Sequence, residues 1–410
     1  MKKSDIPQFG LLQGVRVLVM GPNIAGPQAG SFMADNGAET LLIEGPVSLD
    51  PGRQYPSGSY QKKGKNQRCL IMDWTTDEGR DILLRIVKDM DILIEGHRAN
   101  KFNEWGISDE VLWSANRKLV ICHISGYGQT GDPKYVKRGS YDAITQAFGG
   151  LMNLNGTVDE PMSTNCYNGD FYGANVACWS SLMAYICAQR TGKGESLDIA
   201  AYEAVFANQN WFENYANYGV EYKRAEPAQI GGWQSYKCKD GRVFCATLGP
   251  GFMRKGLKFI GLDPEAPEYK GKMLVNSGQP GCQEIIDALT VFCASKTMQE
   301  ADDLLNDNGI CTSMILGYKE QLANSHYKAR KSYIEFDRGP GKKPEKYITT
   351  GVLPVCKNNP GKVWRAAPLL GEDNEDVLTE VGCSSEQIKS LYDKGILLKD
   401  NDPEQGFYRK

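Results

Sequence analysis

Two hydrophobic periodicities alternate along the first half of the chain. Short, continuous apolar runs have the length of buried strands, and between them apolar residues recur at helical spacing. The apolar runs cover residues 15–20, 40–44, 68–72, 91–95 and 118–125, and the helical segments cover residues 25–36, 78–88 and 109–115. This alternation predicts an α/β fold with a Rossmann-like, doubly wound parallel sheet. In such a fold ligands bind where the carboxyl ends of the strands open into a crevice.

The longest helical segment begins near Asp170, within the sequence GDFYG at residues 169–173. Apolar residues recur along it at spacings of three and four, which predicts one apolar face. These residues are Val176, Trp179, Leu182, Met183 and Ile186. Gly192 and Gly194 end the segment, because glycine favours helix C-termini. Asp170 therefore lies at or near the N-terminus of a long helix.

The second half of the chain predicts a smaller α+β domain. An apparent hairpin joins residues 234–238 to residues 242–246, and a helix follows at residues 298–306. Residues 338–347 are rich in Gly, Pro and Lys, as is typical of a loop, and residues 385–394 indicate a final helix. We expect a large Rossmann-like domain of residues 1–210 and 335–410, a small domain of residues 231–330, and linkers at residues 211–230 and 331–345.

Composition and charge exclude several classes of protein. The chain has 410 residues, 47 basic and 50 acidic side chains and a net charge of -3, which argues against affinity for nucleic acid through phosphate neutralisation. No apolar stretch approaches the ~20 residues that cross a bilayer, and the first residues lack the apolar run of a secretory signal. We therefore expect a cytoplasmic protein that binds neither nucleic acid nor membranes.

The sequence predicts neither a protein-built metal site nor a nicotinamide site. The 12 cysteines include no C-x-x-C pair, and the 3 histidines are not paired at helical spacing. Residues 126–131 do spell G-x-G-x-x-G after a strand, but residues 132–138 do not continue as the apolar helix that a dinucleotide site needs. We interpret these glycines as a tight turn and expect no metal and no NAD.

Two groups of residues carry candidate chemistry. Basic residues lie just after the ends of two predicted strands, where they form either a phosphate-binding cluster or a solvated basic face. They are Arg98, Lys101, Lys134, Lys137 and Arg138. Asp170 is typical of an N-cap, but a helix N-terminus also keeps a carboxylate ionised, and an ionised, desolvated carboxylate can be a nucleophile. The pattern leaves both roles of Asp170 open.

Five segments spread over nearly the whole chain share one family resemblance. They are residues 21–37 (GPNIAGPQAGSFMADNG), 125–157, 169–173 (GDFYG), 191–198 (TGKGESLD) and 359–368 (NPGKVWRAAP). Together they resemble the class III CoA-transferases, and within them the carnitine CoA-transferase and bile-acid CoA-transferase group. Because the segments occur in order, the resemblance is more specific than any single motif. It implies an interlocked homodimer with active sites at the junction of domains and subunits.

The resemblance implies a covalent mechanism centred on Asp170. In that family the aspartate of the Gly-Asp segment is the nucleophile, and here it falls on Asp170. Its carboxylate would attack an acyl-CoA thioester to give a mixed anhydride, and the CoA thiolate would return to give an aspartyl-CoA thioester. A second carboxylic acid would then take over the CoA. Backbone amides near the helix start would stabilise the oxyanions, and coenzyme A, as acyl-CoA co-substrate, is the only cofactor implied.

The resemblance also implies contacts with both substrates. Contacts with CoA fall on Ile24, Ala25, Met72 and Arg98, and its phosphates on Arg98 with Lys137 or Arg138. Contacts with the second substrate fall on Tyr141, Gly231, Gly232 and Gln234, where the glycines belong to a loop that folds over the intermediate as a lid.

Other activities of the same fold stay open at this point. An α-methylacyl-CoA racemase carries a histidine before an aspartate where this chain has Ser140-Tyr141-Asp142, so its second base is missing here. The other alternative is a non-catalytic acyl-CoA-binding protein. For a transferase we expect the acceptor to be a bile acid or a carnitine- or betaine-type acid. The aromatic run at residues 211–215 is typical either of a core segment or of a site that recognises a quaternary ammonium through cation–π attraction.

Overall fold

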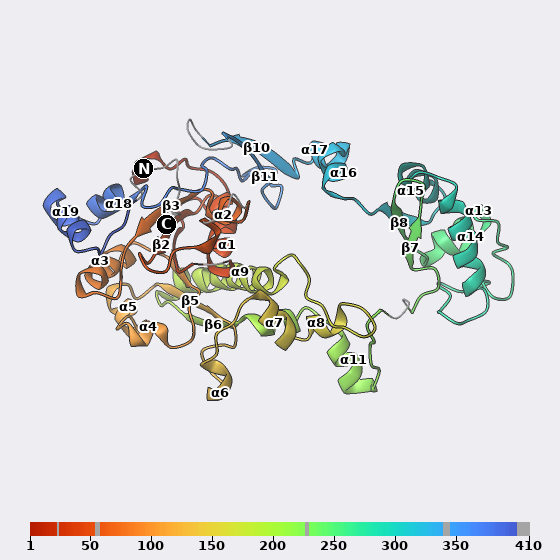
Figure 1. The fold of residues 1–410 in the computed structure, drawn as a ribbon, viewed down its shortest axis with the longest axis horizontal. Coiled ribbons are helices and arrows are strands. Elements are labelled where there is room, and N and C mark those ends of the chain that lie inside the picture. Colours follow the sequence, from red (N-terminus) through yellow and green to blue (C-terminus); the bar gives the residue numbers. More distant parts are fainter. Residues whose placement is uncertain (23, 54–57, 226–228, 339–344, 400–410) are drawn as a thin grey trace. The chain divides into compact units, whose positions relative to one another are not determined.

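The chain forms two compact units, seen in a computed structural model that describes residues 1–22, 24–53, 58–225, 229–338 and 345–399 (Figure 1). The larger unit joins Met1–Arg224 to Arg330–Lys410, and the smaller unit is Ala225–Ala329. Each unit has a hydrophobic core of its own. The larger unit is therefore built from two segments that are far apart in the sequence.

A six-stranded parallel sheet forms the centre of the larger unit, in the order β3-β2-β1-β4-β5-β6. The strands are β1 (Arg16–Met20), β2 (Glu39–Glu44), β3 (Gln67–Ile71), β4 (Ile92–Glu95), β5 (Val120–Ser125) and β6 (Ser196–Ala200). Val19 pairs with Leu42 on one side and with Ile94 on the other. The α/β fold with a parallel sheet is confirmed, and its strand order reverses between β1 and β4, where such sheets bind ligands.

Helices cover both faces of this sheet. Successive residues of β1 point to opposite faces, so Leu18 packs with α3 and α5, whereas Val17 packs with α1 and α9. The helices of the two faces are α1 (Ala25–Asp35), α3 (Asp77–Val87), α5 (Asp109–Ala115), α9 (Asn168–Thr191), α18 (Asn374–Glu380) and α19 (Ser385–Asp393). Shorter helices of this unit are η1 (Lys3–Asp5), η2 (Pro51–Arg53), α2 (Gly58–Gly64), α4 (Lys101–Glu104), α6 (Pro133–Val136), α7 (Asp142–Phe148), α8 (Leu151–Leu154) and α10 (Ala201–Phe206).

Helix α9 packs mainly through small side chains, and of the apolar face that the sequence predicts only Val176 and Leu182 pack against the core. Its buried residues are Gly169, Gly173, Ala174, Ala177, Ser181, Ala184 and Ala188. Trp179, Met183 and Ile186 lie on the outside and are 51%, 56% and 50% exposed. Small residues let α9 approach α1 and the sheet closely, and larger side chains such as Leu182 pack only at the margin of this contact. The larger unit thus presents an apolar stripe to its surroundings.

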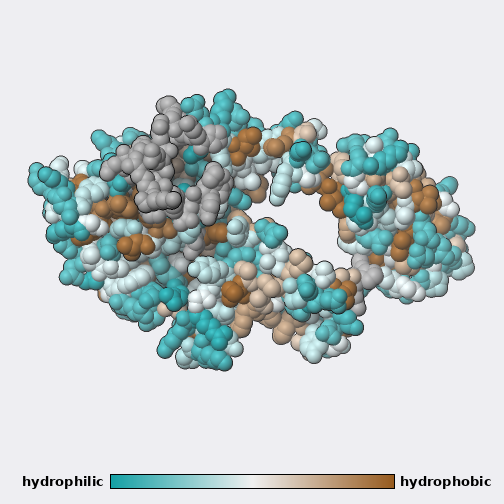
Figure 2. Space-filling view, in the orientation of Figure 1, coloured by the Kyte–Doolittle hydropathy of each residue, from teal (hydrophilic) through white to brown (hydrophobic). Residues whose placement is uncertain are grey.

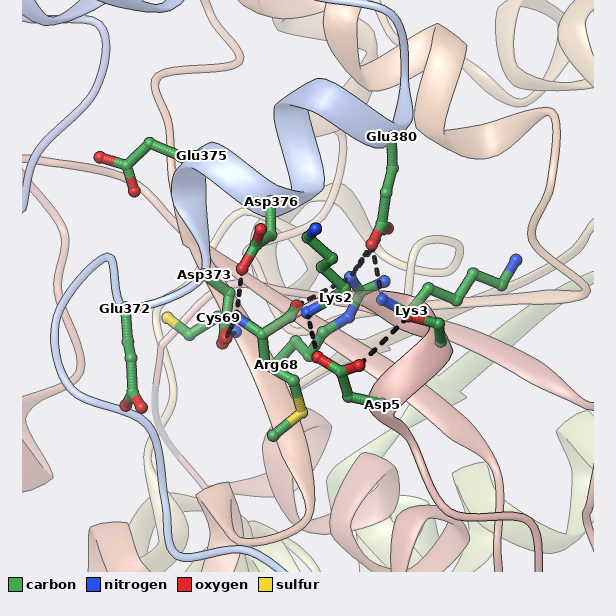
Figure 3. Close-up of polar contacts among 12 residues, drawn as sticks. Lys2, Lys3, Asp5, Arg68, Cys69, Glu372, Asp373, Glu375, Asp376 and Glu380 are labelled. Atoms are coloured by element: carbon green, nitrogen blue, oxygen red, sulfur yellow. Dashed lines mark hydrogen bonds and ion pairs between the residues drawn. The ribbon is translucent and has the colours of Figure 1, made fainter.

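The C-terminal segment closes the edge of the sheet at β3. Asp373 Oδ2 accepts the amide of Cys69 at 2.8 Å, and Asn374 Oδ1 accepts the amide of Ile71 at 3.0 Å. The guanidinium of Arg365 lies 2.9 and 3.0 Å from the two carboxylate oxygens of Asp373. Figure 3 shows Asp373 beside β3, with Arg68 turned toward Glu380 of α18. Side chains thereby pair the backbone groups that an edge strand leaves open.

The smaller unit is an antiparallel sheet packed against helices. Its strands β7 (Gln234–Lys237), β8 (Arg242–Ala246) and β9 (Cys311–Met314) pair in that order, so the hairpin predicted from the alternation is present. Val243, Leu289 and Leu305 are fully buried in its core. The helices are α12 (Gly249–Gly251), η3 (Phe252–Gly256), α13 (Leu257–Phe259), α14 (Cys282–Ala294), α15 (Met298–Asp307), α16 (Tyr318–Ala323) and α17 (Ser325–Ala329).

Two segments that we expected to be linkers are partly ordered elements of the larger unit. Helix α11 (Trp211–Tyr218) lies within the first, and the ring of Trp211 stacks on Tyr222 with centroids 4.6 Å apart. The second contains β10 (Tyr333–Asp337), which pairs with β11 (Lys346–Thr350). Residues 346 and 347 of the expected loop are therefore strand, and residues 339–344 lie outside the described residues. Each segment makes an aromatic contact that composition does not reveal: Trp211 with Tyr222 in the first, and Phe336 with Tyr347 in the second.

Hydrophilic residues cover most of the visible surface of each unit, and small apolar patches interrupt them (Figure 2). None of the described helices combines the length and the apolar character needed to cross a membrane. Within the same described ranges, no three His, Cys, Asp or Glu side chains are grouped so that they could hold a metal ion.

Candidate active site

A cavity of about 1100 Å³ opens in the larger unit at the carboxyl ends of the central strands. Pro22 follows β1, Gly96 follows β4, and Ser125 ends β5, and all three line it. Other parts of its walls come from the start of α1, from η2 and α2, from residues 138–145 and 163–165, from the start of α9 and from α10. The cavity therefore lies at the point where the strand order reverses, as expected for a doubly wound sheet.

Asp170 lies in this cavity, in the first turn of α9. It is the third residue of the helix, so its interpretation as an N-cap is wrong; Tyr167 occupies the N-cap position with a φ of 50°. Among the described residues, none donates a hydrogen bond to the Asp170 carboxylate, although its own backbone amide is bonded. The carboxylate is therefore held by its helix and left unpaired in the cavity.

Asp142, the first residue of α7, occupies the amide groups at the start of α9. Its Oδ1 accepts the amide of Gly169 at 2.8 Å and that of Asp170 at 3.3 Å, and its Oδ2 accepts Gln146 Nε2 at 2.6 Å. Gly169 is required there, because a Cβ atom would lie 2.0 Å from Thr145 Oγ1. These two amides are thus engaged by a carboxylate, contrary to the expectation that amides at the helix start serve the oxyanions.

Burial is the main cause that raises the pKa of Asp170 to about 7, and the negative charge of Asp142 raises it further. The positive charge of Lys63 acts in the opposite direction. The expectation that the helix start keeps Asp170 fully ionised is therefore wrong, because burial and, after it, the charge of Asp142 outweigh the effect of the helix start on its pKa. Near neutral pH the carboxylate exists in both protonation states, which is typical of reactive groups.

The glycine-rich turn after β5 is built for close packing. A Cβ atom on Gly126 would lie 2.0 Å from that of Ser140, and Gly128 has a φ of 86°. Asp198 Oδ1 accepts the amide of Gln129 at 2.7 Å. A helix of only four residues, α6, follows the turn. The amide of Gln129 is therefore not free to hold a pyrophosphate, in line with the interpretation of these glycines as a turn.

The structure brings most of the predicted residues of the larger unit to the cavity. Ile24, Ala25, Arg98, Arg138 and Tyr141 line it together with Asp170. Lys137 is exposed and is not among the lining residues, although it neighbours Arg138. Met72 is fully buried in the hydrophobic core, where its backbone bridges to Leu397, so its side chain packs and does not reach the cavity.

The predicted lid residues form a tightly packed turn in the smaller unit. The amide of Gly231 donates to the carbonyl of Val275 at 2.8 Å, and Thr247 Oγ1 donates to the carbonyl of Gly231 at 2.7 Å. Gly232 has a φ of 81°, and a Cβ atom there would lie 2.7 Å from Ile285. Gln234 is the first residue of β7. Packing explains these glycines, and their role as a lid stays a prediction.

Sequence reasoning missed a buried chain of ionisable groups beside the cavity. His97 lines the cavity, and its Nδ1 lies 3.0 Å from Glu95 Oε2. Glu95 Oε1 lies 2.7 Å from His123 Nδ1, and His123 Nε2 lies 3.0 Å from Asp109 Oδ1. Although burial acts against the charged imidazole, its two carboxylate partners raise the pKa of His123 to about 9. The only sequence signal was that Glu95 ends one predicted strand, with His97 two residues later, while His123 lies within the next predicted strand.

The fold and the cavity define the class: a doubly wound α/β protein with two arginines and a carboxylate, unpaired among the described residues, at the switch point of its sheet. The chain belongs to CoA-transferase family III, whose profile matches residues 12–374. It is 35% identical over 404 residues to the bile acid CoA-transferase BaiK of Clostridium scindens, covering 96% of this chain and 91% of that one. It is 36% identical over 401 residues to the L-carnitine CoA-transferase of Proteus mirabilis, covering 95% and 97%.

A solved structure agrees with the fold. The crystal structure of a CaiB/BaiF family protein from Brucella suis superposes with a TM-score of 0.75 at 24% identity. The superposition covers 91% of this chain and 100% of that one. The resemblance to CoA-transferases predicted from the five segments is thereby confirmed at the level of the family.

Proposed function

We propose that this CoA-transferase moves CoA from an acyl-CoA thioester to a free carboxylic acid through a covalent intermediate on Asp170. The observation that carries the proposal is the Asp170 carboxylate, which has no hydrogen-bond donor among the described residues, in a cavity of about 1100 Å³ that Arg98 and Arg138 also line. A carboxylate with a pKa near 7 is a better nucleophile than an ordinary one and is still ionised often enough to attack.

Each step of the proposed cycle exchanges one bond to an acyl carbon. An oxygen of Asp170 attacks the thioester carbon, the carbon–sulfur bond breaks, and a mixed anhydride and CoA thiolate result. The thiolate attacks the Asp170 carbonyl carbon of the anhydride and releases the first acid as its carboxylate. The aspartyl-CoA thioester then passes its CoA to a second carboxylate by the reverse steps. No proton is gained or lost, so the cycle needs no general base.

The residues around the cavity fit an acyl-CoA. Arg98 and Arg138 offer the planar, permanently charged groups that hold phosphates. Ile24 and Ala25 line the cavity where α1 begins, and a Cβ atom on Gly96 would have nothing within 4 Å, so that stretch of wall leaves open space. We assign the phosphates of CoA to the two arginines and leave Lys137 as a neighbouring surface charge.

We propose a bile acid or a carnitine- or betaine-type acid as the acceptor. The relatives named for bile acids and for L-carnitine are 35% and 36% identical to this chain, so sequence identity does not favour one class of acceptor over the other. A screen of cholyl-CoA and γ-butyrobetainyl-CoA as donors, against carnitine, γ-butyrobetaine and C24 bile acids as acceptors, decides between them. Transfer confined to one acid class identifies that class, and transfer to neither rejects both acceptors.

Covalent labelling tests the role of Asp170. Incubation with a reactive acyl-CoA and then hydroxylamine should convert Asp170 to its hydroxamate, seen by intact mass and peptide mapping. Asp170→Asn should abolish both the label and transfer while the variant remains folded by circular dichroism. A wild-type protein that binds acyl-CoA without becoming labelled would be a non-catalytic binding protein. Transfer by the Asn variant at the wild-type rate would exclude Asp170 as the nucleophile.

A further inference from the structure

Lys63 is a buried lysine that lines the same cavity as the proposed nucleophile. It is the sixth residue of α2, and its Nζ lies 2.7 Å from Asp50 Oδ2. The two side chains are 4% and 1% exposed. Desolvating two ions costs about as much as their attraction returns, and apolar replacements of buried pairs are often neutral or stabilising. Stability therefore does not explain why a charged pair lies beside the cavity.

The pair is oriented with its positive end toward the cavity. Lys63 lines the cavity, and Asp50 does not. Asp50 is turned toward η2, where its Oδ1 accepts the amide of Gly52 at 2.7 Å, and its own amide donates to Glu44 Oε2 at 2.8 Å. These contacts fix the carboxylate, and the carboxylate fixes the ammonium. The cavity therefore faces a cation whose counter-charge lies behind it.

The end of α2 is anchored beside the start of α9. The ammonium of Lys62 lies 4.6 Å from the ring centre of Phe171, the residue that follows Asp170. Ser31 Oγ, on α1, donates to the carbonyl of Lys62 at 3.0 Å, and α1 packs against α9. Two neighbouring lysines thus have separate positions: Lys62 covers Phe171, and Lys63 faces the cavity.

The charged groups around Asp170 come from few elements. Asp142 of α7 and Lys63 of α2 act on it directly, and the pKa of Asp170 is raised by the first and lowered by the second. Arg98, Arg138 and His97 lie on the cavity wall. The lining residues from α1, β5 and α10 carry no charge; they are Ala25, Gly26, Ile124, Ser125 and Ala201. Lys63 is therefore the charge that lowers the pKa of Asp170, whereas burial and Asp142 raise it.

We propose that Lys63, oriented by Asp50, is a positioning residue that holds Asp170 in its ionised, attacking form. This inference rests on the proposed function for its chemistry, because only a nucleophilic carboxylate needs to be ionised. Lys63 fills the role that the amides of Gly169 and Asp170 cannot fill while Asp142 occupies them. The arrangement places a positive charge at the cavity on a lysine that is itself buried and held in position by Asp50.

The decisive experiment titrates Asp170 directly, without substrate. The infrared carbonyl band of protonated Asp170 is isolated as the difference between each full-length protein and its Asp170→Asn counterpart, and its midpoint is followed with pH. Lys63→Met should raise that midpoint by at least about one pH unit, the size expected for removal of a nearby opposite charge. Lys63→Arg should leave it unchanged, and so should Lys62→Met, the matched control. Asp50→Asn should lower it, because Lys63 then loses its counter-charge.

The opposite shifts of the Lys63 and Asp50 variants separate an electrostatic role from damage to the fold, which would move both alike. An unchanged midpoint in Lys63→Met overturns the inference, and so does a rise in Asp50→Asn. If Lys63→Met fails to fold, the direction of the Asp50→Asn shift decides. In parallel, CoA transfer from cholyl-CoA to deoxycholate is measured against pH. Absence of transfer in the wild type would reject the proposed function, while the titration would still decide the role of Lys63.

Discussion

Asp170 is a residue whose environment favours the neutral acid while its proposed chemistry needs the anion. Burial and the neighbouring carboxylate of Asp142 raise its pKa from an ordinary 3.8 to about 7. Between these two values the unfolded chain is ionised where the folded chain holds a proton. Stability is therefore lost as the pH rises from about 4 to about 7, and above that pH the folded protein carries the full penalty.

This penalty predicts that Asp170→Asn stabilises the protein. The amide cannot ionise, so the variant should melt at a higher temperature than the wild type at pH 8, and the difference should shrink toward zero as the pH approaches 4. Melting curves by differential scanning calorimetry across this pH range measure the effect. Thr157→Ser, on an exposed loop, serves as a neutral control. An Asn variant that is less stable at pH 8 would show that the carboxylate is not penalised by burial.

At the residue scale, the sequence predicted Asp170 and the two arginines of the cavity because strand ends and helix starts are visible in the pattern. It did not predict Asp142 as the partner of the α9 amides, because that contact joins two helices across 27 positions. Lys63 reads as part of the run KKGK, which looks like a solvated charge cluster. Lys63 is buried together with Asp50, its partner, and no local sequence pattern predicts such a pair.

At the scale of elements, the carboxylate of Asp373 is the anchor of the segment that closes β3. Asp373 is fully buried, pairs with Arg365 and accepts the amide of Cys69. Removing one partner of a buried pair leaves the other charge uncompensated. The docking of α18 on the sheet therefore depends strongly on this residue.

Asp373→Asn should lower the free energy of unfolding by about 3–5 kcal/mol, the usual cost of breaking a buried pair. Asp376→Asn, three positions further along and 35% exposed, is the matched control and should cost less than about 1 kcal/mol. Urea denaturation followed by fluorescence measures both. Equal losses in the two variants would contradict the assignment of the buried pair as the anchor of this segment.

Strands and amphipathic helices were predictable, whereas the orientation of α9 was not. Five of the parallel strands are continuous apolar runs, so their positions agreed with the sequence within about two residues, but β6, which contains the polar residues Ser196 and Asp198, was not predicted. In α9, the larger apolar side chains such as Met183 dominate the periodicity, although glycine and alanine face the core. A stripe of small residues packs closely and yet carries little hydrophobic signal.

At the scale of the whole molecule, the outer stripe of α9 supports the proposed homodimer. Trp179, Met183 and Ile186 are each at least half exposed on one helix, and such patches on soluble proteins mark interaction sites. Burial of the stripe against a second copy would remove the cost of exposing it. The interlocked arrangement itself is an implication of the family resemblance and stays a proposal.

Met183→Glu should therefore shift the protein from a dimer toward a monomer of 45.4 kDa in light scattering at micromolar concentration. Gln189→Glu adds the same charge to an exposed position of the same helix and should leave the dimer intact. A wild type that elutes as a monomer would reject the dimer. Dimers of equal strength in both variants would place the interface elsewhere.

The closure of β3 by residues near the C-terminus also sets an order of events during synthesis. The ribosome makes the six parallel strands and the entire smaller unit before it makes Asp373 and Asn374. Until these emerge, the nascent larger unit carries an unprotected strand that neighbouring chains can join. Fragments that end before residue 373 should for that reason aggregate in a translation extract, and chaperones that shield extended backbone should bind them.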